Sequence, residues 1–344
     1  MRAHVFITNK DTFPVVRDNS FWGVGIAGIP NTLKKIIKEN LENGRKPYLG
    51  MIADILGTRI GDIIFLYERQ VGFHGIYKIA SESFFDPTSI GCVGETWPIR
   101  VKIECLNYFQ QPVPEDYLFS TKEYESKFWG WFYRKIQGAR GINTINPEAA
   151  EALIELLVKI NGNAINKPNW IKPYPSNNFT QIKLPLDRNG KVYLEVILRA
   201  WLIANIDKLE QKGLRNIFGP AEDIEWFANN VPYHVTKKNI DILVYHKNMK
   251  YTGFPLRYQY SVIELKRDKT KPNDVSQVIN YSKWVAGRLA NSEIETIQPI
   301  LIAYDFDDKT ITKARLSDFS KRNILLYKYK VEDNDIKFEE VEYC

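Results

Sequence analysis

Two apolar runs in the second half of the chain carry charged side chains where strands usually bury apolar ones. The run IDILVYH begins at Ile240 and the run YSVIELK at Tyr260, and both are typical of strands. A helical pattern over residues 192–213 precedes them, and a helix from Asn273 and the strand IQPILIAYDF follow. The order helix, strand, strand, helix, strand predicts a mixed sheet with flanking helices.

Glu264 and Lys266 stand two positions apart in the second run, so they share one face of the strand. Asp241, at the start of the neighbouring strand, is expected to meet them. Two close carboxylates repel each other unless a cation lies between them. Carboxylate oxygens suit Mg²⁺ or Mn²⁺, which activates water and neutralises charge on a phosphate. The pattern indicates phosphodiester hydrolysis, with Lys266 orienting or activating the water.

Asp241 followed in the next strand by Glu264-Leu265-Lys266 resembles the signature of the PD-(D/E)xK nucleases. Glu195 resembles the acid that many members carry on the preceding helix. Asn239 and Ile240 stand where many members have a proline, which is a departure from the pattern.

Further along, Gln277 and Tyr281 resemble the QxxxY element of the RecB-like branch, and residues 190–305 also resemble the catalytic domain of archaeal mismatch endonucleases. The resemblance implies a metal site and a catalytic site. Its metal ligands are Asp241, Glu264 and Glu195, and its further catalytic residues are Lys266, Gln277 and Tyr281.

Simpler structural roles remain open for these residues. Glu264 and Lys266 could form a cross-strand ion pair on a solvated face, and Glu195 could form an i, i+4 salt bridge with Arg199. An acid in so apolar a helix nevertheless needs a partner or an ion.

The first half of the chain predicts a compact mixed barrel with flanking helices. The runs HVFIT, GDIIFLY, GFHGIYKIA and WPIRVKIECL indicate strands, and NTLKKIIKENLENG and NPEAAEALIELLVKI indicate helices. The run that starts with GDIIFLY resembles the core of PUA-like domains of the EVE and YTH kind. That resemblance implies a pocket that accepts a flipped, modified base.

Aromatic rings suit such a pocket because bases stack on them. The pocket candidates are Trp22, Tyr67, Phe73 and Trp97, with Trp129 and Trp131 as further aromatic residues. Any single one of these types is more often a core residue than part of a pocket. In the loop RKIQGARG, the residues Arg134, Lys135 and Arg140 are candidates for contacts to a nucleic-acid backbone.

Chain length and local composition predict the domain organisation. The chain of 344 residues predicts an N-terminal PUA-like domain over 1–160, an Asn- and Pro-rich linker over 161–190 and a nuclease domain over 191–344. The net charge of +6 favours a polyanionic partner. Three scattered cysteines, no signal-peptide pattern and no membrane span predict a cytoplasmic protein.

Together these features predict a modification-dependent DNA endonuclease that reads a modified base in double-stranded DNA and cleaves with Mg²⁺ or Mn²⁺. A mismatch- or structure-specific endonuclease and a non-catalytic reader of modified nucleic acid are the alternatives. Because one such site cleaves one strand, cleavage of both strands predicts a homodimer.

Overall fold

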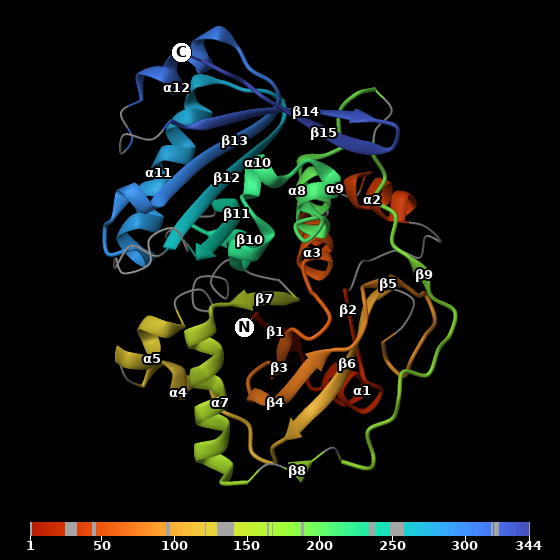
Figure 1. Ribbon diagram of the computed structural model, residues 1–344. Coiled ribbons are helices and arrows are strands. Elements are labelled where there is room, and N and C mark those ends of the chain that lie inside the picture. Colours follow the sequence, from red (N-terminus) through yellow and green to blue (C-terminus); the bar gives the residue numbers. More distant parts are fainter. Residues whose placement is uncertain are drawn as a thin grey trace. The chain divides into compact units, whose positions relative to one another are not determined.

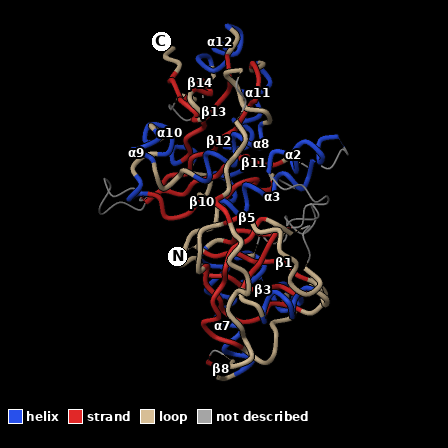
Figure 2. Tube along the Cα trace, turned by 90° about the vertical axis from the view of Figure 1, so that its right-hand side faces the viewer, coloured by secondary structure: helices blue, strands red, loops and turns tan. Residues whose placement is uncertain are grey.

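The structure is a computed structural model that describes residues 2–24, 33–42, 46–93, 97–120, 122–128, 141–163, 165–166, 168–186, 189–233, 238–247, 258–317, 319 and 323–343. The chain forms two compact units, Met1–Lys183 and Leu184–Cys344 (Figures 1 and 2). Both units combine a sheet with helices, so the chain is mixed α/β. In the described ranges, no helix is long and apolar enough to cross a membrane.

The first unit is built around one long antiparallel strand, β6. Its strands are β1 (Ala3–Thr8), β2 (Phe21–Val24), β3 (Ile63–Glu68), β4 (Gly72–Ile79), β5 (Phe84–Phe85), β6 (Ile99–Tyr108), β7 (Ile142–Ile145), β8 (Ile165–Asn166) and β9 (Thr180–Gln181). Its helices are α1 (Thr12–Asp18), α2 (Leu33–Glu42), α3 (Lys46–Leu56), α4 (Glu115–Phe119), α5 (Lys122–Lys127) and α7 (Pro147–Asn161).

The strand order of this unit is β7-β1-β3-β4-β6-β5-β9, and β2 and β8 also pair with β6. β1 runs parallel to β3, whereas the other pairs are antiparallel. In the parts of the chain that are described, no pairing joins β7 to β9. The strand pairing gives a branched, mostly antiparallel sheet around β6, and the mixed barrel expected from the sequence stays a prediction.

Two short strands lie inside the segment predicted as a linker. Residues 161–190 show no strand pattern, yet β8 pairs with β6 and β9 pairs with β5. Each strand contributes only two residues, which is too short for a recognisable period. The boundary between the units falls after Lys183, inside the predicted linker.

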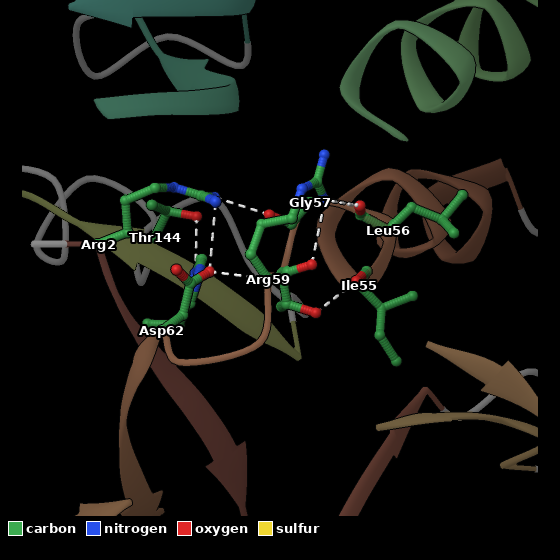
Figure 3. A network of polar contacts seen from close by, with 9 residues as sticks. Arg2, Ile55, Leu56, Gly57, Arg59, Asp62 and Thr144 are labelled. Atoms are coloured by element: carbon green, nitrogen blue, oxygen red, sulfur yellow. Dashed lines mark hydrogen bonds and ion pairs between the residues drawn. The ribbon is translucent and has the colours of Figure 1, made fainter. Parts of the chain in front are cut away.

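A polar network fixes the end of α3 against β1 (Figure 3). Arg2 donates to the carbonyl of Gly57 at 2.7 Å, and Arg59 donates to the carbonyl of Leu56 at the same distance. Asp62 accepts from the backbone N–H of Arg59 at 2.8 Å and pairs with Arg2. Two arginines thus satisfy carbonyl groups that a helix leaves without partners at its C-terminal end.

The second unit contains a six-stranded mixed sheet. Its strands are β10 (Ile224–Pro232), β11 (Asn239–Lys247), β12 (Tyr258–Lys269), β13 (Ile297–Asp305), β14 (Leu325–Glu332) and β15 (Asp335–Glu340), and they lie in that order. Its helices are α8 (Glu195–Ala204), α9 (Leu209–Lys212), α10 (Arg215–Phe218), α11 (Pro272–Leu289) and α12 (Asp308–Leu316), with the short 3₁₀ turns η1 (Ala221–Asp223) and η3 (Ile294–Thr296). β12, β13 and β14 are parallel, and the remaining pairs are antiparallel.

The long helix predicted over 192–213 is interrupted. α8 ends at Ala204, where the amide of Asn205 donates to the carbonyl of Trp201 at 2.8 Å, and α9 then ends at Gly213 in a left-handed conformation. Asparagine competes for helix carbonyls in this way, which explains the break. α8 packs its apolar side chains on the sheet face that carries Ile263 and Leu265.

Candidate active site

Strands β11 and β12 bring two acids together. Ile242 pairs with Ile263 in the antiparallel register, and the same register continued by one residue places Asp241 opposite Glu264. The backbone N–H of Leu265 donates to Asp241 Oδ2 at 2.9 Å. Directly opposed side chains share one face of a sheet, so the two carboxylates lie side by side. The sequence prediction that Asp241 meets the Glu264 strand agrees with this geometry.

Glu264 is the most deeply buried acid of this cluster, with 2% of its surface exposed. Its Oε1 accepts hydrogen bonds from the ammonium of Lys266 and, at 2.7 Å, from the amide of Gln277. Its Oε2 is buried and has no hydrogen-bond partner among the described residues. Burial, and then the charge of Asp241, raises the pKa of Glu264 well above its usual range.

Lys266 supplies the positive charge next to Glu264. Burial opposes the charged form of this lysine, but the negative charge of Glu264 and the hydrogen bond to it raise the pKa of Lys266. Lys266 is therefore an ammonium at neutral pH. In this state it can hold and orient a water or a phosphate oxygen, whereas removal of a proton would require Lys266 to lose its own proton first.

Gln277 and Tyr281 lie one turn apart on α11. The amide nitrogen of Gln277 donates both to Glu264 and, at 2.9 Å, to the hydroxyl of Tyr281. Tyr281 is buried, and its ring lies 4.7 Å from the ring of Tyr233. α11 therefore positions the carboxylate of Glu264 through Gln277, which Tyr281 holds in turn.

Glu195 is the first residue of α8 and the third acid near this site. Burial, and then the charge of Asp241, raises the pKa of Glu195 to about 7, whereas Lys266 and Arg199 act in the opposite direction. The sequence left open an i, i+4 salt bridge between Glu195 and Arg199. In the structure, Arg199 pairs with Asp241 instead. Arg199 donates to Asp241 Oδ1 at 2.8 Å.

Replacing Glu195 with Gln should stabilise the metal-free protein at high pH. The pKa of Glu195 is about 7 in the folded chain against 4.5 ordinarily, so the folded state binds the proton more tightly. Ionised Glu195 therefore lowers the free energy of unfolding above pH 7 and has no such effect below pH 4.5. We expect a gain of about 1–3 kcal/mol at pH 8 and none at pH 4.

Urea unfolding with a chelator present measures this effect at both pH values. Glu225→Gln is the matched control, because Glu225 is exposed and pairs with Lys247 on the sheet surface. A gain that is equal at pH 4 and pH 8 would contradict the assigned shift.

The donor set matches an oxygen-preferring divalent cation in type. Asp241 and Glu264 offer carboxylate oxygens, and the unpartnered Glu264 Oε2 is a buried acceptor that a cation would satisfy. In the described ranges, however, no group of three or more His, Cys, Asp or Glu side chains is arranged to hold a metal ion. Glu195 as a third metal ligand thus stays a prediction, and water or substrate oxygens would complete the coordination, as is common for Mg²⁺.

The structure separates the four aromatic candidates of the first unit into two pairs. Trp22 and Trp97 are neighbours, with ring centroids 6.3 Å apart, and Trp97 is half-buried whereas Trp22 is fully buried. Tyr67 and Phe73 pack together at 4.9 Å within another apolar cluster. The four rings thus pack as two pairs, and their role in a base pocket stays a prediction.

Trp22 also has a structural role. Its ring leaves no space at Gly141, where an added Cβ would lie 2.7 Å from a ring carbon. Its indole nitrogen donates to the carbonyl of Ile7 at 3.3 Å. Of the four candidates, only Trp97 is partly exposed, and it has an aromatic neighbour in Trp22.

The remaining nucleic-acid contacts predicted from the sequence are untested. Arg134, Lys135 and Arg140, and the aromatic residues Trp129 and Trp131, lie outside the described residues.

Arg199 is the site residue whose role the sequence did not reveal. Its partner stands on β11, which lies far away in the sequence, so helix spacing alone suggested Glu195 instead. The available signal was a charged residue in the apolar part of a helix, which requires a buried counter-charge.

The similar proteins described below each cover less than half of the chain. No protein-family model matches it. It is similar to a UPF0310 protein of Pyrococcus abyssi, with 28% identity over 160 residues that span 44% of this chain and 96% of the relative.

Similar solved structures include human THYN1 in complex with 5-methylcytosine containing DNA, with 12% identity, a TM-score of 0.29 and coverage of 46% of this chain and 98% of that chain. They also include the YTH domain of Zygosaccharomyces rouxii MRB1 in complex with N6-methyladenosine RNA, with 13% identity, a TM-score of 0.25 and coverage of 45% and 86%. Values this low carry no ligand or activity over to this chain.

Proposed function

We propose that the chain is a divalent-metal-dependent DNA endonuclease whose second unit hydrolyses phosphodiester bonds and whose first unit reads a modified base. The observation that carries the catalytic half is the meeting of Asp241, Glu264 and Lys266, with Glu264 Oε2 buried and unpartnered. Such an arrangement of buried charge costs free energy, and functional sites are where proteins keep such arrangements.

Each residue then has a defined task. Asp241 and Glu264 would hold Mg²⁺ or Mn²⁺, which supplies Lewis acidity toward a phosphate when bound. Lys266 orients a water or a phosphate oxygen, and Gln277 holds Glu264 in place. Glu195 is the third metal ligand that the resemblance implies, and its raised pKa in the metal-free site means that a proton would leave it when a cation binds there.

Support for the reader half comes from the sequence resemblance and from Trp97. This residue is partly exposed and lies next to Trp22, so its ring would offer one surface for stacking a base. A double-strand break would further require two copies of the chain, which is why we propose a homodimer for that reaction.

A non-catalytic reader is the second candidate. The observation that favours it is that Arg199 already pairs with Asp241, while Lys266 pairs with Glu264. In that case the acidic cluster would be a buried ion-pair network without a metal.

Incubation with matched duplexes separates these functions. The substrates carry 5-methylcytosine, N6-methyladenine, a single mismatch or none of these, and each is tested with Mg²⁺, Mn²⁺ or a chelator. We expect metal-dependent cleavage of one modified duplex only. Cleavage of the mismatched duplex would replace the modified-base proposal with a mismatch endonuclease, and binding without any cleavage would favour the reader.

Replacing Trp97 with Ala should weaken binding to the modified duplex by about 1–3 kcal/mol, because one stacking surface is lost. Binding to the unmodified duplex should hardly change. Fluorescence anisotropy measures both affinities in the presence of Ca²⁺ in place of Mg²⁺.

Trp170→Ala is the matched control, since Trp170 is an exposed tryptophan of the same unit that stacks on Arg17. Equal losses on both duplexes would show that Trp97 has a packing role only.

A further inference from the structure

Arg199 neutralises Asp241, a carboxylate that a metal ion would be expected to bind. Its guanidinium reaches from α8 to Asp241 Oδ1 at 2.8 Å, and the same nitrogen lies 3.3 Å from Asn230 Oδ1. Arg199 Nε is buried and has no hydrogen-bond partner among the described residues. The arginine is therefore held mainly by the carboxylate and not by a complete set of hydrogen bonds.

Charge balance explains why the arginine is there. The charge of Asp241 acts on both Glu195 and Glu264, and the main positive charges that act on them are Lys266 and, for Glu195, also Arg199. Buried carboxylates without counter-charge are strongly destabilising. Lys266 is directed at Glu264, so Arg199 is the counter-charge of Asp241.

We propose that Arg199 is the internal counter-ion of this acidic cluster in the metal-free protein, and that a divalent cation bound by Asp241 and Glu264 displaces it from Asp241. This inference rests on the proposed function. A divalent cation and a guanidinium on the same carboxylate repel each other strongly at low dielectric constant. Binding of the metal therefore requires Arg199 to move, and the two cations compete for Asp241.

Asn230 gives the displaced guanidinium an acceptor. This residue lies in β10 with a φ of 51°, a left-handed conformation that asparagine tolerates better than most residues. Its side-chain oxygen already lies near Arg199. A small rotation of the guanidinium away from Asp241 would keep one hydrogen bond.

The test compares wild type with Arg199→Met and Arg199→Lys by Mn²⁺ titration calorimetry and by thermal unfolding with and without Mn²⁺. Methionine retains the apolar stem but removes the competing charge, so Arg199→Met should bind Mn²⁺ about tenfold or more tightly. Without metal, its unfolding midpoint should fall by about 5–10 °C, because Asp241 loses its partner. Saturating Mn²⁺ should remove most of that deficit.

Arg199→Lys keeps the charge and should bind Mn²⁺ with nearly wild-type affinity. Lys191→Met is the control for the loss of one positive charge, since Lys191 pairs with Asp268 on the surface; it should leave Mn²⁺ affinity unchanged.

Two outcomes overturn the inference in different ways. If wild type binds Mn²⁺ and Glu264→Gln abolishes that binding, but Arg199→Met binds no more tightly or its deficit persists with Mn²⁺, Arg199 has only a structural role. If wild type binds no Mn²⁺ at all, the proposed metal site is wrong and the competition falls with it.

Discussion

Glu264→Gln will abolish DNA cleavage and leave DNA binding intact. The substitution keeps the shape of the side chain but replaces one carboxylate oxygen, Oε1 or the unpartnered Oε2, by an NH₂ group. The side chain thereby loses its negative charge and becomes a poorer ligand for a divalent cation. We expect a loss of at least about 10³-fold in the cleavage rate, equivalent to ~4 kcal/mol of transition-state stabilisation. Single-turnover cleavage of the preferred duplex measures the rate, and anisotropy measures binding.

The same variant should change the free energy of unfolding little, because two effects oppose each other. A neutral amide removes the cost of burying the carboxylate, whose pKa is raised, but it also takes away the negative partner of the Lys266 ammonium. Asp268→Asn is the control, because Asp268 lies on the same strand, is exposed and pairs with Lys191. Wild-type cleavage by Glu264→Gln would refute the catalytic proposal, whereas lost binding would indicate a wider structural defect.

Lys266→Met should slow cleavage by about 10²–10⁴-fold, the range for removal of one group that assists proton transfer or charge stabilisation. Metal affinity should be retained or rise, because the variant removes a positive charge and no ligand. Mn²⁺ titration calorimetry measures the metal affinity, and so it shows whether slower cleavage results from loss of the metal.

Lys269→Met provides the control on the same strand, since Lys269 is exposed and pairs with Asp305 at 3.4 Å. If Lys266→Met lost its metal affinity together with its activity, the lysine would be required to shape the site, and its assigned role would be wrong.

The sequence predicted the core of the site because strand periodicity is a local property. Alternation alone places Glu264 and Lys266 on one face, and the short-range element Gln277-x-x-x-Tyr281 places both side chains on one side of α11. The sequence also led us to expect that Asp241, at the start of the neighbouring strand, meets the strand of Glu264, whereas the antiparallel register comes from the structure.

Other parts depend on contacts between distant residues and could not be predicted. Arg199 finds its partner across 42 positions of sequence, and the hydrogen bonds of Glu264 decide which of its oxygens remains without a partner. In the first unit, composition identified the aromatic residues but not their packing. Burial separates Trp97 from Tyr67 and Phe73, and no sequence pattern distinguished them.

All six candidate catalytic residues belong to the compact unit Leu184–Cys344, and four of them fall between Glu264 and Tyr281. One strand and the helix that follows it therefore carry most of the chemistry on a single continuous piece of chain. If the proposed division of labour holds, target choice and bond cleavage can change independently during evolution. An exchange of the first unit for a reader of another modification would then redirect the enzyme without altering a residue that touches the scissile phosphate.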